Sequence, residues 1–165
     1  SFHSHLSKKH TIFSYGDELV SNGEKIDIAT SFDVIEHVND PLNYLSDIYN
    51  SLNVGGEFYI KTPNHNEILH DLLADDYAKF DYRTAHLFYF NKESMAYMLK
   101  QIGFNVIKIK YEHCMDISNM MLWLRDRVPT GNGKNNLFDA EFNMIYKNYL
   151  ERIGKASHLF VYVKK

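Results

Sequence analysis

The chain has 165 residues, of which 45% are hydrophobic and 24% are charged, and this is enough apolar material for one folded domain. Its formal net charge of −3 excludes the strongly basic composition with which many nucleic-acid-binding domains contact phosphates. The single cysteine, Cys114, cannot form an internal disulfide, and no apolar run approaches the roughly 20 residues of a membrane span. These properties predict a cytoplasmic protein that acts on a small molecule, with no nucleic-acid or membrane partner, and they leave its oligomeric state open.

The first predicted strand, residues 11–15, is short and ends in a turn at Gly16-Asp17. The polar segment before it is rich in histidine, at His3, His5 and His10. No carboxylate or cysteine accompanies these imidazoles, so we predict no metal site there, and none elsewhere in the chain.

Residues 26–32 form a nearly continuous apolar run, IDIATSF, which is typical of a strand buried on both faces of a parallel sheet. Ligands of open α/β sheets bind beyond the carboxyl ends of the strands. The residues directly after this strand are therefore the first candidates for function: Asp33, Glu36 and His37.

A helix is predicted next, with Asp40 as its N-cap and Pro41 at its first position. Apolar residues recur along it at helical spacing and predict one buried stripe: Leu42, Leu45, Ile48, Tyr49 and Leu52. Gly55-Gly56 is expected to end this helix before a second strand, residues 57–62. Because a helical crossover of this length joins parallel neighbours, the end of the second strand is expected beside the Glu36-His37 turn.

A short helix is predicted at residues 66–73, and aromatic side chains are dense between Tyr77 and Phe90 around a single histidine, His86. Placed after the second strand, these aromatic residues predict a lid that excludes water from the crevice at the strand ends. The alternative, that they form the core of a covering layer, stays open.

The next helix, residues 92–102, has strong end signals, with Asn91 as its cap and Gly103 as its stop. Strands are predicted at residues 104–111 and 158–163. Two helical patterns lie between them, one in Ile117, Met120, Met121 and Leu124, the other in Phe138, Phe142, Ile145, Tyr149 and Ile153.

The loop PTGNGKNN, residues 129–136, joins these two helical patterns. Its GNGK does not have the spacing of a phosphate-binding loop and does not follow a strand. We therefore interpret it as a flexible linker.

Three segments together resemble one protein family: IDIATSFDVIEHVNDP, NVGGEFYIKTPN and AHLFYFNKESMAYMLKQIGF. In this order and spacing they resemble the second half of a class I S-adenosylmethionine (SAM)-dependent methyltransferase, of the kind that includes the ubiquinone-biosynthesis O-methyltransferases. The resemblance covers roughly residues 11–104. It implies a partial Rossmann-like α/β fold, in which the last two strands pair as an antiparallel hairpin and residues 112–157 are a helical insertion.

The resemblance also implies an activity, which is methyl transfer from SAM to a small-molecule acceptor, expected at a hydroxyl oxygen. Asp17 then corresponds to the acid that binds the adenine amino group, Phe32 packs against the adenosyl group, and Ser31 is its backbone neighbour. An Asp after a Gly is also an ordinary turn former, and this interpretation of Asp17 stays open.

His86 and His37 are the candidate catalytic bases, because histidine titrates near neutral pH and both are expected to face the crevice. His86 is preferred, since in the resembling family a histidine at this position lies near the substrate pocket. His37 has a structural alternative, in which it anchors the turn through Glu36 or a backbone carbonyl.

Two parts of a SAM site are missing from the sequence: a glycine-rich turn after the family's first strand, and the acid that holds the ribose. Only ten residues precede residue 11, and the chain begins with Ser. We therefore expect residues 1–165 to be a single domain that lacks its N-terminal SAM-binding half and binds SAM weakly or not at all by itself. The alternative function is a non-catalytic methyltransferase-like module that binds a partner through its helical insertion.

Overall fold

The computed structural model describes residues 18, 21, 23–129 and 138–165. Within them a four-stranded sheet has the order β1-β2-β4-β3, with the bounds β1 Ile26–Phe32, β2 Leu52–Pro63, β3 Asn105–Glu112 and β4 His158–Lys164. β1 is parallel to β2, whereas β4 is antiparallel to both β2 and β3. The α/β class, the parallel β1-β2 pair and the closing antiparallel hairpin are confirmed. The strand predicted at residues 11–15 lies outside the described residues.

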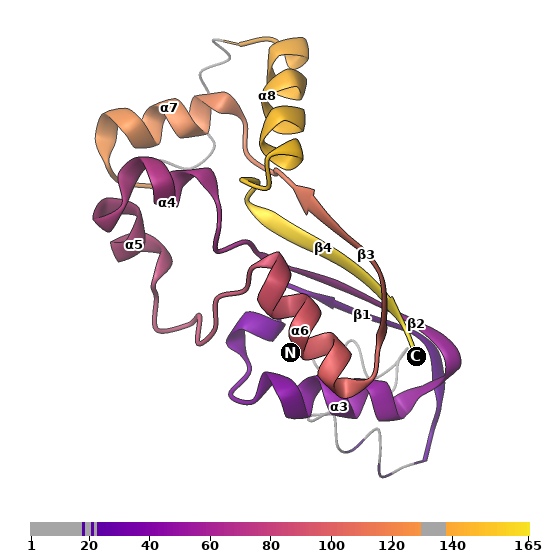
Figure 1. The fold of residues 1–165 in the computed structure, drawn as a ribbon. Helices are drawn as coiled ribbons and strands as arrows, with labels where there is room; N and C mark the ends of the chain where they lie inside the picture. The colour runs from indigo at the N-terminus through magenta and orange to yellow at the C-terminus, as the bar shows by residue number, and fades with distance from the viewer. Residues whose placement is uncertain (1–17, 19–20, 22, 130–137) are drawn as a thin grey trace, which may run out of the picture.

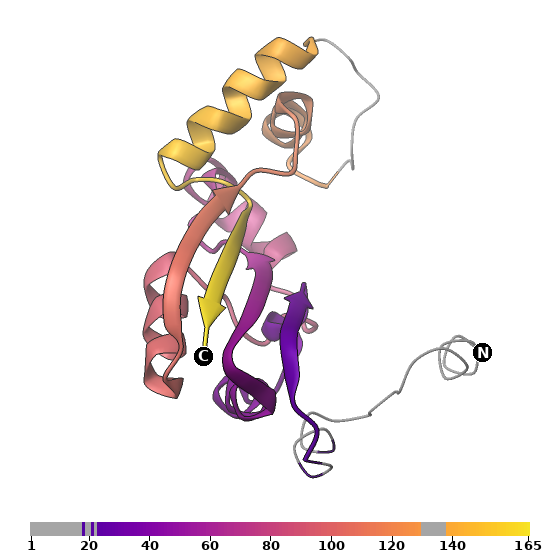
Figure 2. The same cartoon turned by 90° about the vertical axis from the view of Figure 1, so that its right-hand side faces the viewer.

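Helices cover one face of the sheet and gather beyond one of its ends (Figure 1). On the covered face, α3 (Pro41–Ser51) packs beside α6 (Lys92–Ile102). Figure 2 shows α7 and α8 beyond the end at which β3 stops and β4 starts, which is also the carboxyl end of β1 and β2. The remaining helical bounds are η1 Ile35–His37, α4 Ile68–Leu73, α5 Asp75–Asp81, α7 Ile117–Asp126 and α8 Ala140–Arg152. Every helix in the described part of the chain is too short or too polar to cross a lipid bilayer.

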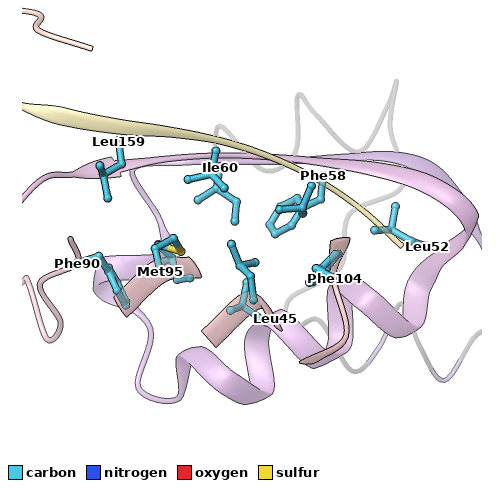
Figure 3. Close-up of a cluster of buried hydrophobic side chains, with 12 residues drawn as sticks. Leu45, Leu52, Phe58, Ile60, Phe90, Met95, Phe104 and Leu159 are labelled. Atoms are coloured by element: carbon cyan, nitrogen blue, oxygen red, sulfur yellow. The ribbon is translucent and has the colours of Figure 1, made fainter. Parts of the chain in front are cut away.

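The main hydrophobic core lies between the sheet and the α3-α6 pair (Figure 3). Phe58 and Ile60 of β2 point into it, because strand residues two apart share a face. They meet Leu45 of α3 and Met95 and Leu99 of α6, and all five side chains are fully buried. Packing in this core fixes the position of β2, whose carboxyl end carries part of the candidate site.

β1 has the predicted bounds, but the prediction that both of its faces are buried is wrong. Ile28 and Phe32 are 62% and 48% exposed, whereas Ser31, on the opposite face, is buried. Within the described residues β2 is the only strand that pairs with β1, and α3 and α6 lie on the Ser31 side. The apolar run indicated a strand, but it carried no information on how many layers cover that strand.

α3 begins as predicted. The Asp40 carboxylate accepts a hydrogen bond of 3.0 Å from the backbone N–H of Asn43, and Pro41 is the first helical residue. Leu45 of the predicted stripe is fully buried, but Leu42 is exposed, so the stripe is narrower than predicted at the start of the helix.

The predicted end of this helix at Gly55-Gly56 is wrong. α3 ends at Ser51, and Leu52 already begins β2. The two glycines lie instead in the irregular start of β2, where the register with β1 shifts. Gly55 has a φ of +81°, and a Cβ on Gly56 would lie 2.9 Å from the carbonyl oxygen of Asn53. The glycines thus permit a distorted strand rather than a helix stop.

Replacing the N-cap, Asp40→Ala, is expected to lower the free energy of unfolding by about 1 kcal/mol, because the first turn of α3 loses its side-chain acceptor. Urea denaturation measures the change. Asp40→Asn retains an acceptor oxygen and is the matched control, with a smaller loss expected. An unchanged urea midpoint for Asp40→Ala would contradict a stabilising role of the cap.

α6 has the predicted bounds and the predicted ends. The Asn91 side chain accepts from the Ser94 backbone N–H at 2.9 Å, and the Ser94 hydroxyl accepts from the Asn91 N–H at 3.1 Å. Gly103 follows with a φ of +112°, in the left-handed region that favours glycine. Both ends are encoded within a few residues, which explains why the prediction succeeded.

α7 and α8 are the two helices predicted between β3 and β4, and the apolar residues that indicated α8 do not mark its buried face. Phe142, Ile145 and Tyr149 are all exposed. The inner face carries Asn143, whose side-chain oxygen accepts from the backbone N–H of Ile117, together with the buried Leu150. Met121, which belongs to the apolar pattern that indicated α7, is also exposed. The linker predicted after Pro129 lies outside the described residues.

His113, the residue directly after β3, is 3% exposed. Its Nδ1 accepts a hydrogen bond of 3.1 Å from the backbone N–H of Ser157. Burial, together with the smaller effects of Lys147 and His158, lowers the pKa of His113 from an ordinary value of 6.5 to about 4. The neutral imidazole is therefore the form that the fold accommodates.

Stability is therefore expected to fall as the pH drops from about 6.5 towards 4, because the unfolded chain binds a proton at His113 that the folded chain excludes. At pH 5 this corresponds to about 2 kcal/mol. Urea denaturation at pH 7 and pH 5 measures it. In His113→Asn, which keeps an acceptor for the Ser157 N–H, that part of the pH dependence should disappear. Equal pH dependence in both proteins would contradict a neutral buried His113.

Candidate functional site

The carboxyl ends of β1 and β2 lie side by side, as predicted. The backbone N–H of Asp33 donates to the carbonyl of Lys61 at 2.9 Å, and Asp33 has a φ of +54° at this sharp exit from β1. Thr62, at the end of β2, donates from its hydroxyl to the Glu36 carboxylate at 2.9 Å. Glu36 is 2% exposed. A buried carboxylate therefore stands at the point where the two strands end.

The loop that carries His86 docks on this turn through its backbone. The N–H groups of Leu87 and Phe88 both donate to the carbonyl oxygen of Glu36, at 2.8 and 3.2 Å. The His86 ring lies edge-on to the His37 ring, with centroids 4.9 Å apart. The two candidate bases thus lie together, although 48 residues separate them in the chain.

The hydrogen bonds assign the tautomer of His37. Its Nδ1 lies 2.6 Å from the carbonyl oxygen of Ala85, and because a carbonyl only accepts, Nδ1 carries the proton. In the neutral ring Nε2 keeps the lone pair, and this nitrogen lies 3.8 Å from a carboxylate oxygen of Glu36. His86 differs, because its Nδ1 is buried and has no hydrogen-bond partner within the described residues. The anchoring role that was the alternative for His37 is compatible with this geometry.

A cavity of about 420 Å³ adjoins His86. One wall is aromatic, with Tyr77 and Phe80 from α5 and Trp123 from α7, which contact one another edge-to-face or tilted. The aromatic segment therefore supplies both core and cavity wall, and it begins with a helix, α5, that the sequence analysis did not predict. The sequence also did not indicate that Trp123 lines the cavity, because its position in the apolar pattern of α7 indicates only that it is buried.

Among the described residues, the polar wall of the cavity contains four ionisable groups besides His86: Glu67, Asp81, Arg83 and His158. Burial raises the pKa of Glu67, although the Tyr77 hydroxyl donates to its carboxylate at 2.6 Å. Burial likewise lowers the pKa of His158. Both shifts favour the neutral forms of these two groups, and the other ionisable side chains on this wall are Arg83 and Asp81, whose carboxylate lies 2.9 Å from His70 Nε2.

The residues predicted to bind the cofactor are only partly assembled in the described structure. Asp17 lies outside the described residues. Ser31 is buried, and its hydroxyl accepts from Tyr44 at 2.9 Å, so its side chain faces α3 and only its backbone is available on the strand. Phe32 presents a half-exposed ring at the tip of β1, 5.9 Å from the ring of Phe160. An exposed ring at a strand tip fits one side of an adenosyl site.

Comparisons with known proteins agree with this arrangement. A family model described as a methyltransferase domain matches residues 4–109. Among solved structures, the chain resembles a SAM-dependent methyltransferase from Archaeoglobus fulgidus at 17% identity and a TM-score of 0.57, covering 93% of this chain and 66% of that one. It also resembles a SAM-dependent methyltransferase, possible histamine N-methyltransferase, from Thermotoga maritima at 17% identity and a TM-score of 0.55, covering 86% and 56%.

A third similar structure is a putative methyltransferase of Haloferax volcanii in complex with the Trm112 methyltransferase activator, at 14% identity and a TM-score of 0.52, covering 86% of this chain and 54% of that one. No curated protein sequence matches the chain. The chain spans 54–66% of the length of these three structures, and similarity at such low identity indicates the fold. Because the family model matches most of the chain, the protein belongs to the methyltransferase-domain family, and its sheet is part of a class I SAM-dependent methyltransferase fold.

Proposed function

We propose that the protein containing this chain is a SAM-dependent methyltransferase that methylates a hydroxyl oxygen of a small molecule. The observation that carries the proposal is the position of His86, which belongs both to the Glu36-His37 turn and to the wall of the 420 Å³ cavity. One histidine thus joins the strand ends, where ligands of α/β sheets bind, to a space of suitable size for a small acceptor.

On the cofactor side, Phe32 would pack against the adenosyl group, Ser31 would border it through its backbone, and Asp17 would bind the adenine amino group. Bound SAM would supply an electrophilic methyl group, with the electron pair of the broken carbon–sulfur bond remaining on sulfur. The exposed ring of Phe32 and the location of Ser31 at the same strand tip support this assignment.

On the acceptor side, methylation of a hydroxyl oxygen releases one proton. We assign its acceptance to His86, because imidazole accepts protons near neutral pH and its Nδ1 has no hydrogen-bond partner within the described residues. His37 would hold the turn, since its Nδ1 proton is already used by the carbonyl of Ala85. The aromatic cavity wall favours a planar, ring-containing acceptor, in keeping with the resemblance to ubiquinone-biosynthesis O-methyltransferases.

The direct test measures S-adenosylhomocysteine released from SAM by the intact protein with a series of phenols and with the corresponding anilines. We expect release with phenols and little with anilines. Release with anilines alone would retain methyl transfer and overturn oxygen as the acceptor. Calorimetric titration with SAM is the companion measurement, and no binding by the intact protein would overturn the enzymatic proposal.

The second candidate function is a non-catalytic methyltransferase-like module that binds another protein through its helical insertion. It is favoured by the exposed apolar stripe of α8, formed by Phe142, Ile145 and Tyr149. One structurally similar methyltransferase was solved in complex with an activator protein. The SAM titration separates the two candidates, because a module without the cofactor site would show no binding heat.

A further inference from the structure

The side chains of Glu36, His37 and His86 converge at the ends of β1 and β2. Each offers one ligand atom, either a carboxylate oxygen or a ring nitrogen, and these three atoms lie within 4.8 Å of one another. Ligands of a tetrahedral Zn²⁺ bound at about 2.0–2.1 Å are roughly 3.3 Å apart. The 3.8 Å between His37 Nε2 and the Glu36 oxygen is close to that spacing, and small side-chain rotations would bring all three into range.

We propose that Glu36, His37 and His86 bind a divalent transition-metal ion. The donor set consists of two imidazoles and one carboxylate, which suits ions of intermediate softness such as Zn²⁺ better than Mg²⁺, since Mg²⁺ prefers oxygen ligands.

The tautomer of His37 is the one that a metal ligand requires. Its Nδ1 donates a hydrogen bond to the carbonyl of Ala85. This bond fixes the orientation of the ring and therefore the direction in which Nε2 points. Metal-binding histidines commonly make such a bond from the other ring nitrogen, which sets the orientation and raises the basicity of the ligand.

Glu36 contributes a buried carboxyl group to this cluster. Its side chain is 3% exposed, one oxygen is held by the Thr62 hydroxyl, and His37 is the only described residue within ion-pair distance of it. Buried carboxylates are generally paired with a cation or coordinate a metal. His86 adds a buried Nδ1 with no hydrogen-bond partner within the described residues, so a metal at this point would satisfy groups from both chain segments.

The catalytic role of this metal rests on the proposed function. The existence of the metal site does not depend on that function. Three protein ligands leave at least one coordination position open, and His86 also borders the cavity. A metal there would bind the acceptor oxygen and lower the pKa of its hydroxyl, so that the proton would pass to water before the methyl group moves from sulfur to that oxygen. With the metal bound, His86 would be a ligand rather than a base, and the metal would activate the hydroxyl.

The test is calorimetric titration of the chelator-treated 165-residue chain with Zn²⁺ alone. All proteins carry Ala at His3, His5 and His10, so that these imidazoles contribute no binding. We expect one site per chain, weakened at least 100-fold in His86→Asn and in Glu36→Gln, and unchanged within twofold in His65→Ala, which removes an imidazole outside the cluster. Mg²⁺ should bind far more weakly than Zn²⁺.

Thermal melting keeps the result interpretable if a variant folds poorly, because Zn²⁺ should raise the Tm of the parent protein and not that of His86→Asn. Absence of Zn²⁺ binding by the parent, or equal binding by His86→Asn, would overturn the metal site. Methyl transfer that proceeds unchanged in chelator would overturn its catalytic role and leave the proposed function intact. Zn²⁺ binding in a protein that does not bind SAM would support the site and overturn the proposed function.

Discussion

His86→Ala is expected to lower kcat for methyl transfer by about 10²–10⁴-fold, which is the usual contribution of a general base. The loss has the same direction whether His86 accepts the proton or holds the proposed metal, because both roles activate the acceptor oxygen. SAM affinity should change little, since His86 lies on the cavity side of the Glu36-His37 turn. The measurements are kcat and the calorimetric Kd for SAM, both in the intact protein.

The matched control is His65→Ala, which removes an imidazole that neither lines the cavity nor belongs to the Glu36 cluster. Its kcat should stay within about threefold of the parent. His37→Ala should instead weaken SAM binding or stability, because its ring ties the turn to the carbonyl of Ala85. Near-full turnover in His86→Ala would place the base elsewhere or show that none is needed.

Trp123→Ala is expected to lower the free energy of unfolding by about 3–5 kcal/mol, the range for removing a large buried aromatic side chain. Trp123 is 4% exposed and packs edge-to-face against Tyr77 and Phe80, at centroid distances of 5.2 and 5.1 Å. These contacts join α7 to α5, so their loss removes packing that holds the insertion over the cavity. Guanidinium denaturation measures the change.

Met121→Ala is the control for Trp123, since Met121 lies on the same helix with its side chain exposed and should change stability by less than about 0.5 kcal/mol. Trp123 also lines the cavity, so Trp123→Phe, which keeps a ring, should retain more acceptor affinity than Trp123→Ala in KM measurements. Equal stability losses in Trp123→Ala and Met121→Ala would contradict the packing described for α7.

Parts of the candidate site were predictable because they depend on neighbours in the chain or on a general rule of parallel sheets. The hydrogen bond from Thr62 to Glu36 follows from two adjacent strand ends, which the helical crossover predicts. The meeting of His37 with His86 has no such local cause. It depends on a loop that docks through the N–H groups of Leu87 and Phe88, contacts that no residue spacing indicates.

Local residue patterns were enough to predict the elements whose ends are made by local hydrogen bonds and restricted backbone angles. These are the Asp40-Pro41 start of α3 and both ends of α6, where each cap lies within four residues of the groups that it satisfies. The side of an element that is buried depends instead on its contacts with distant segments. The period of α8 suits either face, and the face carrying Asn143 and Leu150 is buried because those side chains meet α7 and the strand ends. The exposure of β1 and the assembly of Glu36, His37 and His86 were decided in the same way, since burial and convergence depend on contacts between segments far apart in the chain.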